Sequence, residues 1–228
     1  MSLSFLDLLF PKRCVSCNRL GSYLCHQCLS KIKFVEYQIC PTCQRPSITG
    51  ATHPKCQTKY SLDGLISITK FEGPIRIAIH KLKYKWISDL GETLVSLILD
   101  NLWKQKALPA DKFTVVPVPL APKREHWRGF NQAALLGKII AQKLEFDFSD
   151  SLIIKIKETK PQVELKARER RDNVAGVFKV GVKEEAEDGN FLLVDDMTTT
   201  GATLRSCGLV LKRTGALKVW ALTLARSR

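Results

Sequence analysis

Long apolar runs are missing from this sequence. The longest, at residues 75–79 and 94–99, fall well short of the roughly 20 residues that a membrane span needs. Glycine and proline, with 13 and 10 among 228 residues, are too sparse for a collagen-like or low-complexity chain. Because 45% of the residues are hydrophobic, we expect one ordinary globular domain with a small appendage.

Acidic residues are also scarce. The chain has 22 Asp and Glu against 36 Lys and Arg, a formal charge of +14, and residues 1–60 are the most basic part for their length. Such a surface attracts polyanions, for example nucleic acid or phosphorylated ligands. A generally basic protein without a polyanion partner remains an alternative, because charge alone carries little specificity.

The N-terminal residues do not have the order of a secretory signal. Asp7 interrupts their apolar positions, and Lys12 and Arg13 follow the apolar run instead of preceding it. We therefore expect a cytoplasmic protein. Residues 1–11 could form a short amphipathic helix that packs on the body, or that lies against a partner or the inner face of the membrane.

Only one of the eight cysteines, Cys207, lies beyond residue 56, and we interpret it as a small buried hydrophobe. The other seven and one histidine form four pairs with two residues between the members of each pair. A reducing compartment disfavours disulfides, and a two-residue gap lets both members bind one tetrahedral zinc ion. These pairs predict two structural zinc ions held by Cys14, Cys17, Cys25, Cys28, Cys40, Cys43, His53 and Cys56.

The short loops between the pairs favour sequential pairing, with the first four ligands on one ion and the last four on the other. An interleaved arrangement remains open. Residues 1–60 have too few large apolar side chains for a core of their own, so metal binding and folding should be coupled. We expect a double zinc-ribbon domain at residues 1–60 and a second domain at residues 61–228.

From residue 62 onward, strand and helix patterns alternate. Strands are predicted at residues 65–68, 115–118 and 191–194, and helices at residues 74–84, 89–104 and 130–144. Strands that alternate with helices indicate a parallel sheet covered on both faces. The predicted fold class is α/β, a parallel sheet flanked by helices, preceded by the small zinc-ribbon head.

The predicted strand at residues 191–194 leads directly into Asp195 and Asp196, and then into a Thr- and Gly-rich loop that opens a helix at residues 204–213. Such a loop directs backbone N–H groups and hydroxyls at one point, where the helix N-terminus adds positive charge, so it forms a phosphate cradle. Gly201 lets the backbone approach the phosphate. The carboxylates can accept hydrogen bonds from ribose hydroxyls and help hold Mg²⁺. A threonine-capped turn is the alternative, but it does not explain the two acids.

This strand, acid pair and Thr-Thr-Gly-x-Thr loop resemble the phosphoribosyl pyrophosphate (PRPP) motif of type I phosphoribosyltransferases. The resemblance implies a type I phosphoribosyltransferase-like sheet that binds PRPP with Mg²⁺ and holds the ribose on Asp195 and Asp196. It also implies that the 5′-phosphate is held by Thr198, Thr199, Thr200, Gly201, Ala202 and Thr203.

The order of further segments resembles the ComF family over essentially the whole chain. After the zinc pairs, these segments are residues 80–84, 117–120, 128–132, 160–162 and 168–174. Members of that family are associated with natural competence and the handling of incoming DNA, in some bacteria beside a helicase-like ATPase. The resemblance implies a role in DNA uptake or processing, and it does not imply a demonstrated transfer reaction.

Positive side chains accompany the predicted pocket. By the resemblance, residues 117–124, a strand end entering a loop, lie where a pyrophosphate would bind, and residues 160–173 lie where a mobile flap excludes water. These groups contact a pyrophosphate, line a groove for nucleic acid, or are solvated surface charges. The candidates are Lys123, Arg124, Arg128, Lys160, Arg168 and Arg171.

Two functions are compatible with these observations. A phosphoribosyltransferase would transfer ribose 5-phosphate from PRPP to a nucleophile while cations neutralise the departing pyrophosphate. A binding protein would hold PRPP or a terminal DNA phosphate while the zinc head and the basic surface follow single-stranded DNA. Binding is the better supported function, because Tyr84, Trp86 and Trp127 are interleaved with basic residues. Core packing is the alternative for these aromatic side chains.

Overall fold

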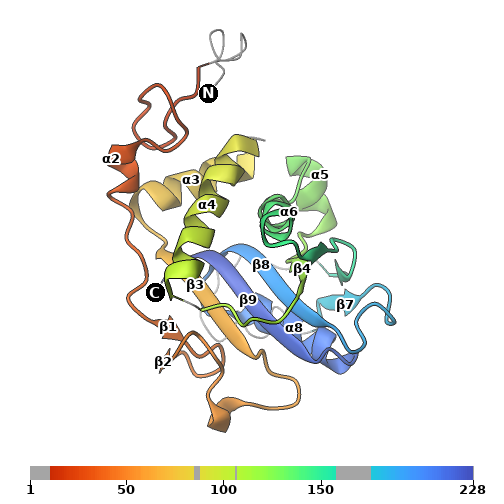
Figure 1. Ribbon diagram of the computed structural model, residues 1–228. Helices are drawn as coiled ribbons and strands as arrows, with labels where there is room; N and C mark the ends of the chain where they lie inside the picture. The colour runs from red at the N-terminus through yellow and green to blue at the C-terminus, as the bar shows by residue number, and fades with distance from the viewer. Residues whose placement is uncertain (1–10, 85–87, 106, 158–175, 228) are drawn as a thin grey trace.

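The structure is a computed structural model that describes residues 11–84, 88–105, 107–157 and 176–227 (Figure 1). Its centre is a sheet of five parallel strands in the order β3-β9-β8-β4-β5. The strands are β3 (Gly64–Lys70), β4 (Thr114–Pro117), β5 (Asp147–Phe148), β8 (Asn190–Thr198) and β9 (Lys218–Arg226). The predicted α/β class is confirmed.

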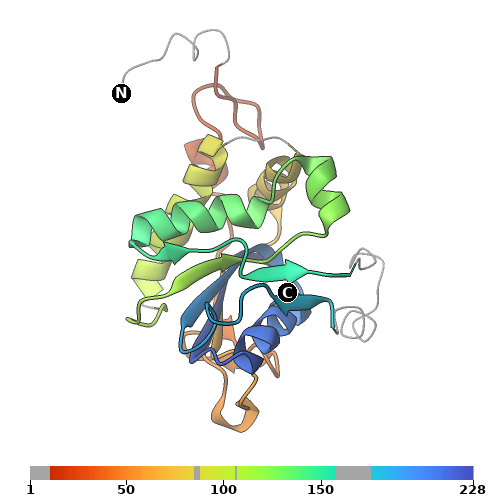
Figure 2. The same ribbon diagram turned by 90° about the vertical axis from the view of Figure 1, so that its right-hand side faces the viewer.

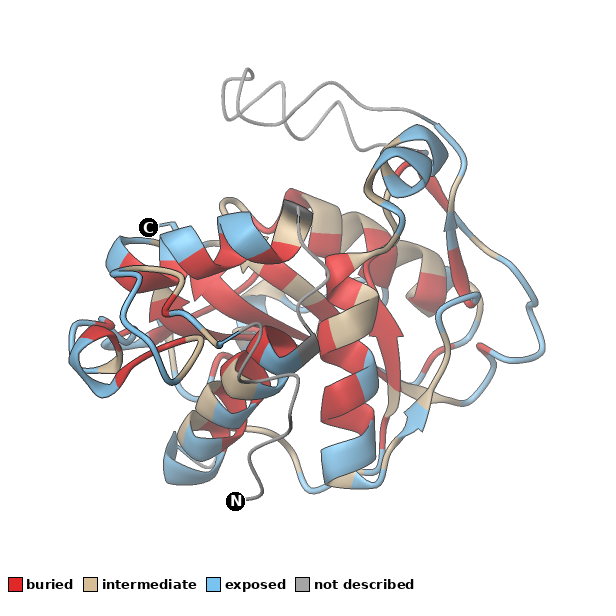
Figure 3. Ribbon diagram, turned by 90° about the horizontal axis from the view of Figure 1, so that it is seen from above, coloured by how far each residue is buried: buried red, intermediate tan, exposed pale blue. Residues whose placement is uncertain are grey.

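Helices cover both faces of this sheet (Figure 2). One face carries α3 (Gly73–Tyr84), α4 (Ser88–Gln105) and α6 (Gln132–Leu144). The opposite face carries α8 (Ala202–Arg213) and the antiparallel pair β6 (Ile153–Lys155) and β7 (Phe178–Val180). Buried side chains form two clusters. Figure 3 shows buried residues along the strands and on parts of the helices that cover them. No helix in the described ranges has both the length and the apolar character to cross a membrane.

The spacing of apolar residues explains these elements. In α3, Ile75, Ala78, Ile79 and Leu82 are fully buried, and their spacing places one stripe of the helix against the sheet. In β8, residues 191–194 are buried without alternation. A central parallel strand that is covered on both faces has this pattern.

The connections that follow the neighbouring parallel strands β4 and β8 run toward opposite edges of the sheet. β4 continues through α5 (Pro122–Arg128) and α6 to β5, whereas β8 continues through α8 to β9 on the other side. Such a switch point opens a crevice at the carboxyl ends of the two strands, where ligands bind in open α/β sheets. The topology therefore places residues 195–203 at the edge of the sheet where a ligand is expected.

Residues 12–56 lie along the β3 side of the sheet (Figure 1). They contain α2 (His26–Leu29), β1 (Gln38–Ile39), β2 (Pro46–Ser47) and the 3-10 helix η1 (Pro54–Cys56). We call residues 33–52 the strap. Lys70 N–H donates to the Lys33 carbonyl at 2.8 Å, and Leu65 N–H donates to the Gly50 carbonyl at 2.9 Å. The strap thus covers a strand edge that would otherwise present unpaired backbone groups.

Within the strap, the side chain of Gln38 takes the place of a backbone partner for β3. Its Nε2 donates to the Ser67 carbonyl, and its Oε1 accepts from Ser67 N–H, both at 2.9 Å. Gln38 and Ser67 are both buried, so the two backbone groups of Ser67 depend on this amide for their hydrogen bonds.

Some elements differ from the expectation. The sequence patterns do not predict β9, although every residue after its first is buried, and β5, β6 and β7 are too short for a periodic pattern. Residues 122–124, expected in a loop, instead begin α5, with Pro122 at the first helical turn. Proline suits this position because its missing N–H is not needed there.

Replacing Gln38 with leucine is expected to lower the free energy of unfolding by about 2–4 kcal/mol, because Ser67 N–H and C=O both stay buried and lose their partner. Denaturant unfolding of the full chain measures the change. Gln142→Leu, at an exposed position of α6, is the control and should shift stability by less than about 0.5 kcal/mol. Equal stability of the two variants would contradict the role assigned to Gln38.

Candidate functional site

The predicted metal ligands gather into two clusters. Within each, the ligand atoms lie within 4.8 Å of one another, and the members are Cys14, Cys17, Cys25 and Cys28 in the first, and Cys40, Cys43, His53 and Cys56 in the second. This grouping confirms the sequential pairing and excludes the interleaved one. Each cluster offers four sulfur or nitrogen ligands, the set that a structural zinc ion prefers.

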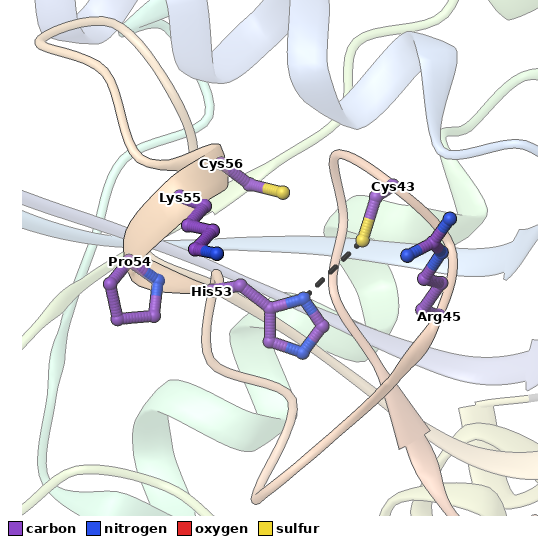
Figure 4. A pocket seen from close by; sticks show the side chains of 6 residues that line it. All are labelled: Cys43, Arg45, His53, Pro54, Lys55 and Cys56. Atoms are coloured by element: carbon purple, nitrogen blue, oxygen red, sulfur yellow. Dashed lines mark hydrogen bonds between the residues drawn. The ribbon is translucent and has the colours of Figure 1, made fainter.

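In the second cluster, both nitrogen atoms of the His53 ring have a partner. Nδ1 lies 3.3 Å from Cys43 Sγ, and Nε2 lies 3.0 Å from the Pro46 carbonyl oxygen. Because a carbonyl oxygen only accepts, Nε2 carries the proton and Nδ1 presents its lone pair to the sulfur atoms, as a zinc ligand requires. Figure 4 shows this ring between Cys43 and Cys56.

Backbone N–H groups prepare one thiol of each cluster for metal binding. Burial raises the pKa of Cys14, but backbone donors led by Cys25 N–H outweigh it and lower the pKa to about 6. In the second cluster, burial opposes backbone donors led by Cys43 N–H, and the pKa of Cys40 falls to about 7. Burial and then the neighbouring thiols raise the pKa of Cys56 to about 11. A bound divalent cation supplies the charge that the last deprotonation needs.

The first cluster packs against the helices of the body. Cys14, Cys25 and Cys28 belong to the same buried cluster as Ile75 of α3 and Leu90 of α4. The metal site therefore contributes to the core on this face, which fits a structural ion better than a catalytic one.

At the switch point, β8 presents two carboxylates that differ in their surroundings. Asp196 is buried, and its Oδ2 lies 2.8 Å from Lys83 Nζ at the end of α3. Asp195 is half-buried, and its Oδ1 accepts a hydrogen bond from Asp196 N–H at 2.8 Å. Lys83 is not among the predicted pocket residues, although it lies in one of the segments that carry the family resemblance. The contact depends on how α3 packs, and sequence spacing does not show this.

The surroundings of Asp195 also affect its protonation. Burial raises the pKa of Asp195 well above its ordinary value, and the adjacent charge of Asp196 raises it further, while Lys83 acts in the opposite direction. The Asp195 carboxylate is therefore ionised at a cost, and added positive charge or hydrogen-bond donors would lower that cost.

Residues 198–203, which we call the phosphate loop, connect β8 to α8. Gly201 has a φ of +70° and immediately precedes the first residue of α8. This left-handed conformation favours glycine. Thr200 Oγ1 is buried and has no hydrogen-bond partner among the described residues. The loop thus holds a hydroxyl with unused hydrogen-bonding capacity next to the N-terminus of α8.

Three of the six predicted anion contacts lie on α5, which follows the carboxyl end of β4. Lys123 is exposed, Arg124 is half-buried, and Arg128 Nη1 donates to Gln132 Oε1 at 3.1 Å. The other three, Lys160, Arg168 and Arg171, lie outside the described residues, as does Trp86.

Comparisons with known proteins agree with this organisation. The double zinc ribbon domain family matches residues 5–57. Competence protein F of Haemophilus influenzae is 29% identical, over 95% of this chain and 98% of that protein. DNA utilization protein YhgH of Salmonella typhimurium is 30% identical over 87% and 89% of the two chains. Competence protein ComFC of Bacillus subtilis is 30% identical over 90% and 84%.

Native mass spectrometry of the full chain is expected to show two zinc ions, because each cluster is a complete tetrahedral set. Cys14→Ser and Cys40→Ser should each lose one ion. Cys207→Ala is the control, since Cys207 is buried in α8 outside both clusters, and it should keep both ions. A single ion in the wild type would contradict the assignment of two sites.

Asp195→Asn is expected to stabilise the fold at neutral pH. Because the folded-state pKa is raised, the folded chain binds more protons than the unfolded chain above the ordinary carboxyl range, so wild-type stability falls as pH rises through this window. The asparagine variant escapes this loss, and its melting temperature should exceed that of the wild type by about 2–4 °C at about pH 7.

Thermal unfolding at several pH values tests the sign of this effect. The stabilisation should not shrink as pH rises from about 6 to about 8. Asp100→Asn, at an exposed position of α4, is the control and should melt as the wild type does. A destabilised Asp195→Asn would contradict the assignment of a costly carboxylate at this position.

Proposed function

The chain belongs to the ComF family, and from this premise we propose that it binds PRPP or a related phosphate ligand with Mg²⁺, and acts on single-stranded DNA during DNA uptake or processing. The observation that carries the ligand proposal is the junction of β8 and α8. It brings two carboxylates and a Thr- and Gly-rich loop to the switch point of the sheet, where ligands of open α/β sheets bind.

The phosphate loop offers what a 5′-phosphate needs. The N-terminus of the 12-residue helix α8 provides backbone N–H groups and partial positive charge. Thr200 Oγ1 is buried without a hydrogen-bond partner among the described residues, and a phosphate oxygen could supply that partner. A threonine-capped turn without a ligand leaves this hydroxyl unexplained.

The two acids have different proposed roles at the ribose. Asp196 is already paired with Lys83, so it is held in place and its charge is balanced by the protein. Asp195 has a raised pKa, and in its ionised form it would accept hydrogen bonds from ribose hydroxyls. Mg²⁺ bound with the ligand would supply positive charge that favours this ionised form.

DNA contact is proposed for α5 and its surroundings. Trp127 is 71% exposed on a helix that also carries Lys123 and Arg124. An exposed indole beside cationic side chains provides stacking for a base and attraction for the backbone of a single strand. α5 follows the end of β4, at the same edge of the sheet as the phosphate loop. The names of the relatives, competence protein and DNA utilization protein, support a role with DNA.

Isothermal calorimetry of PRPP with Mg²⁺ tests the ligand proposal. Wild type should bind, and the Asp195→Asn, Asp196→Asn double variant should lose binding by about 100-fold or more, because charge-assisted hydrogen bonds to the ribose disappear. Asp100→Asn with Asp150→Asn removes the same charge from exposed positions and should bind as the wild type does. Absence of binding by the wild type would overturn the proposal.

Measurement of single-stranded DNA binding tests the DNA part of the proposed function. The affinity should fall steeply as salt is added, with a linear dependence of log K on log salt concentration. Trp127→Ala should weaken binding by about 1–3 kcal/mol. Trp103→Ala is the control, since Trp103 is similarly exposed, at 68%, but lies on α4. Affinity independent of salt, or equal losses in both variants, would contradict the assigned surface.

A further inference from the structure

Arg205 joins the second zinc cluster to the phosphate loop. It lies in the first turn of α8, and its Nη1 donates to the Pro41 carbonyl at 2.8 Å and to the Thr200 carbonyl at 2.6 Å. Pro41 is buried and lies in the turn between two zinc ligands, Cys40 and Cys43. One guanidinium nitrogen therefore contacts both the metal-binding turn and the loop proposed to hold a phosphate.

The placement of this arginine is unfavourable without such partners. A cation in the first turn of a helix opposes the helix dipole, and two carbonyl oxygens offset that cost at Arg205. Gly201 leaves room for the arrangement, because a Cβ on this glycine would lie 3.2 Å from Arg205 Nη1. Glycine at position 201 therefore permits both the close approach of Arg205 and the left-handed backbone conformation.

The metal-binding turn is itself held in one conformation. Gln44 N–H donates to the Cys40 carbonyl at 3.0 Å, and Gln44 Nε2 donates to the Pro41 carbonyl at 3.1 Å. Coordination of zinc by Cys40 and Cys43 would fix the same turn from the other side. Zinc at this cluster would therefore restrict the position of the Pro41 carbonyl, to which Arg205 is anchored.

A second arginine ties the strap to the same edge of the sheet. Arg226, at the end of β9, donates from Nη2 to the Tyr37 carbonyl at 3.0 Å and pairs in the sheet register with Thr198, the first residue of the phosphate loop. The strap and the loop are therefore held together from two different elements.

We propose that Arg205 is a positioning residue that couples the second zinc cluster to the phosphate loop, so that zinc binding and phosphate-ligand binding strengthen each other. The inference rests on the proposed function of the loop. Coupling between two binding equilibria is reciprocal. Zinc should raise the affinity for PRPP, and PRPP with Mg²⁺ should raise the affinity of the second cluster for zinc by the same factor.

The test measures the equilibrium zinc affinity of the full chain by competition with a chromophoric chelator, with and without saturating PRPP and Mg²⁺. In the wild type, PRPP should raise the zinc affinity of one of the two sites by about fivefold or more. Arg205→Met should lose this gain in zinc affinity and bind PRPP more weakly by a similar factor. Arg76→Met is the matched control, because Arg76 is exposed on α3, and it should behave as the wild type does.

The outcomes separate this inference from the proposed function. If the wild type binds PRPP in calorimetry but its zinc affinity is the same with and without PRPP, the coupling is overturned and the proposed function stands. If the wild type does not bind PRPP, both are overturned. Neither result depends on how well a variant folds, because both come from the wild-type protein.

Arg205→Lys separates the hydrogen bonds from the charge. Lysine keeps the positive charge but lacks the planar set of donors, so the variant should show a smaller gain in zinc affinity with PRPP and an intermediate affinity for PRPP. A gain equal to that of the wild type would overturn the shared contact to two carbonyl groups as the cause. Circular dichroism and the zinc content of each variant show whether it is folded before its zinc affinity is measured.

Discussion

The pairing of β8 between β4 and β9 is the constraint on which the rest of the structure depends. Because all three strands are parallel and their connections diverge, the carboxyl end of β8 lies at a switch point with helices on both faces. A strand in this position must be apolar along residues 191–194 and can be polar only where it ends. The acid pair, the phosphate loop and the start of α8 are the polar residues that follow directly from this arrangement.

The metal clusters fix residues 12–56 to the rest of the fold, because this segment has few large apolar side chains of its own. The first cluster joins the core beneath α3 and α4. The second includes Cys40 and Cys43 of the strap, and Arg205 reaches the Pro41 carbonyl between them. On either side of this turn the strap follows β3, through the Gln38 amide and through the backbone carbonyls of Lys33 and Gly50. Metal coordination would therefore fix the chain path at two points, and hydrogen bonds to the sheet fix it elsewhere.

Much of this organisation can be predicted from the sequence, because short-range spacing carries it. The four ligand pairs are local, and the acid pair and threonine loop follow one strand within a few residues. The contacts that the sequence does not reveal join distant segments: Lys83 with Asp196, Arg205 with Pro41, and Gln38 with Ser67. Each depends on the packing of two elements, which no periodic pattern specifies. β9 is not predicted because a strand buried on both faces has no alternation to distinguish it from a helix segment, and no sequence motif follows it as the acid pair and threonine loop follow β8.

The coverage of β3 has a consequence for the behaviour of the protein when its metal is scarce. An uncovered, seven-residue apolar strand at the edge of a sheet is a template on which another chain can add, and β3 is buried along six of its seven residues. In the described part of the chain, the strap covers this edge, and it contains two ligands of the second zinc cluster. Loss of zinc from that cluster would loosen the strap and expose the edge to self-association, so bound zinc would protect solubility as well as shape.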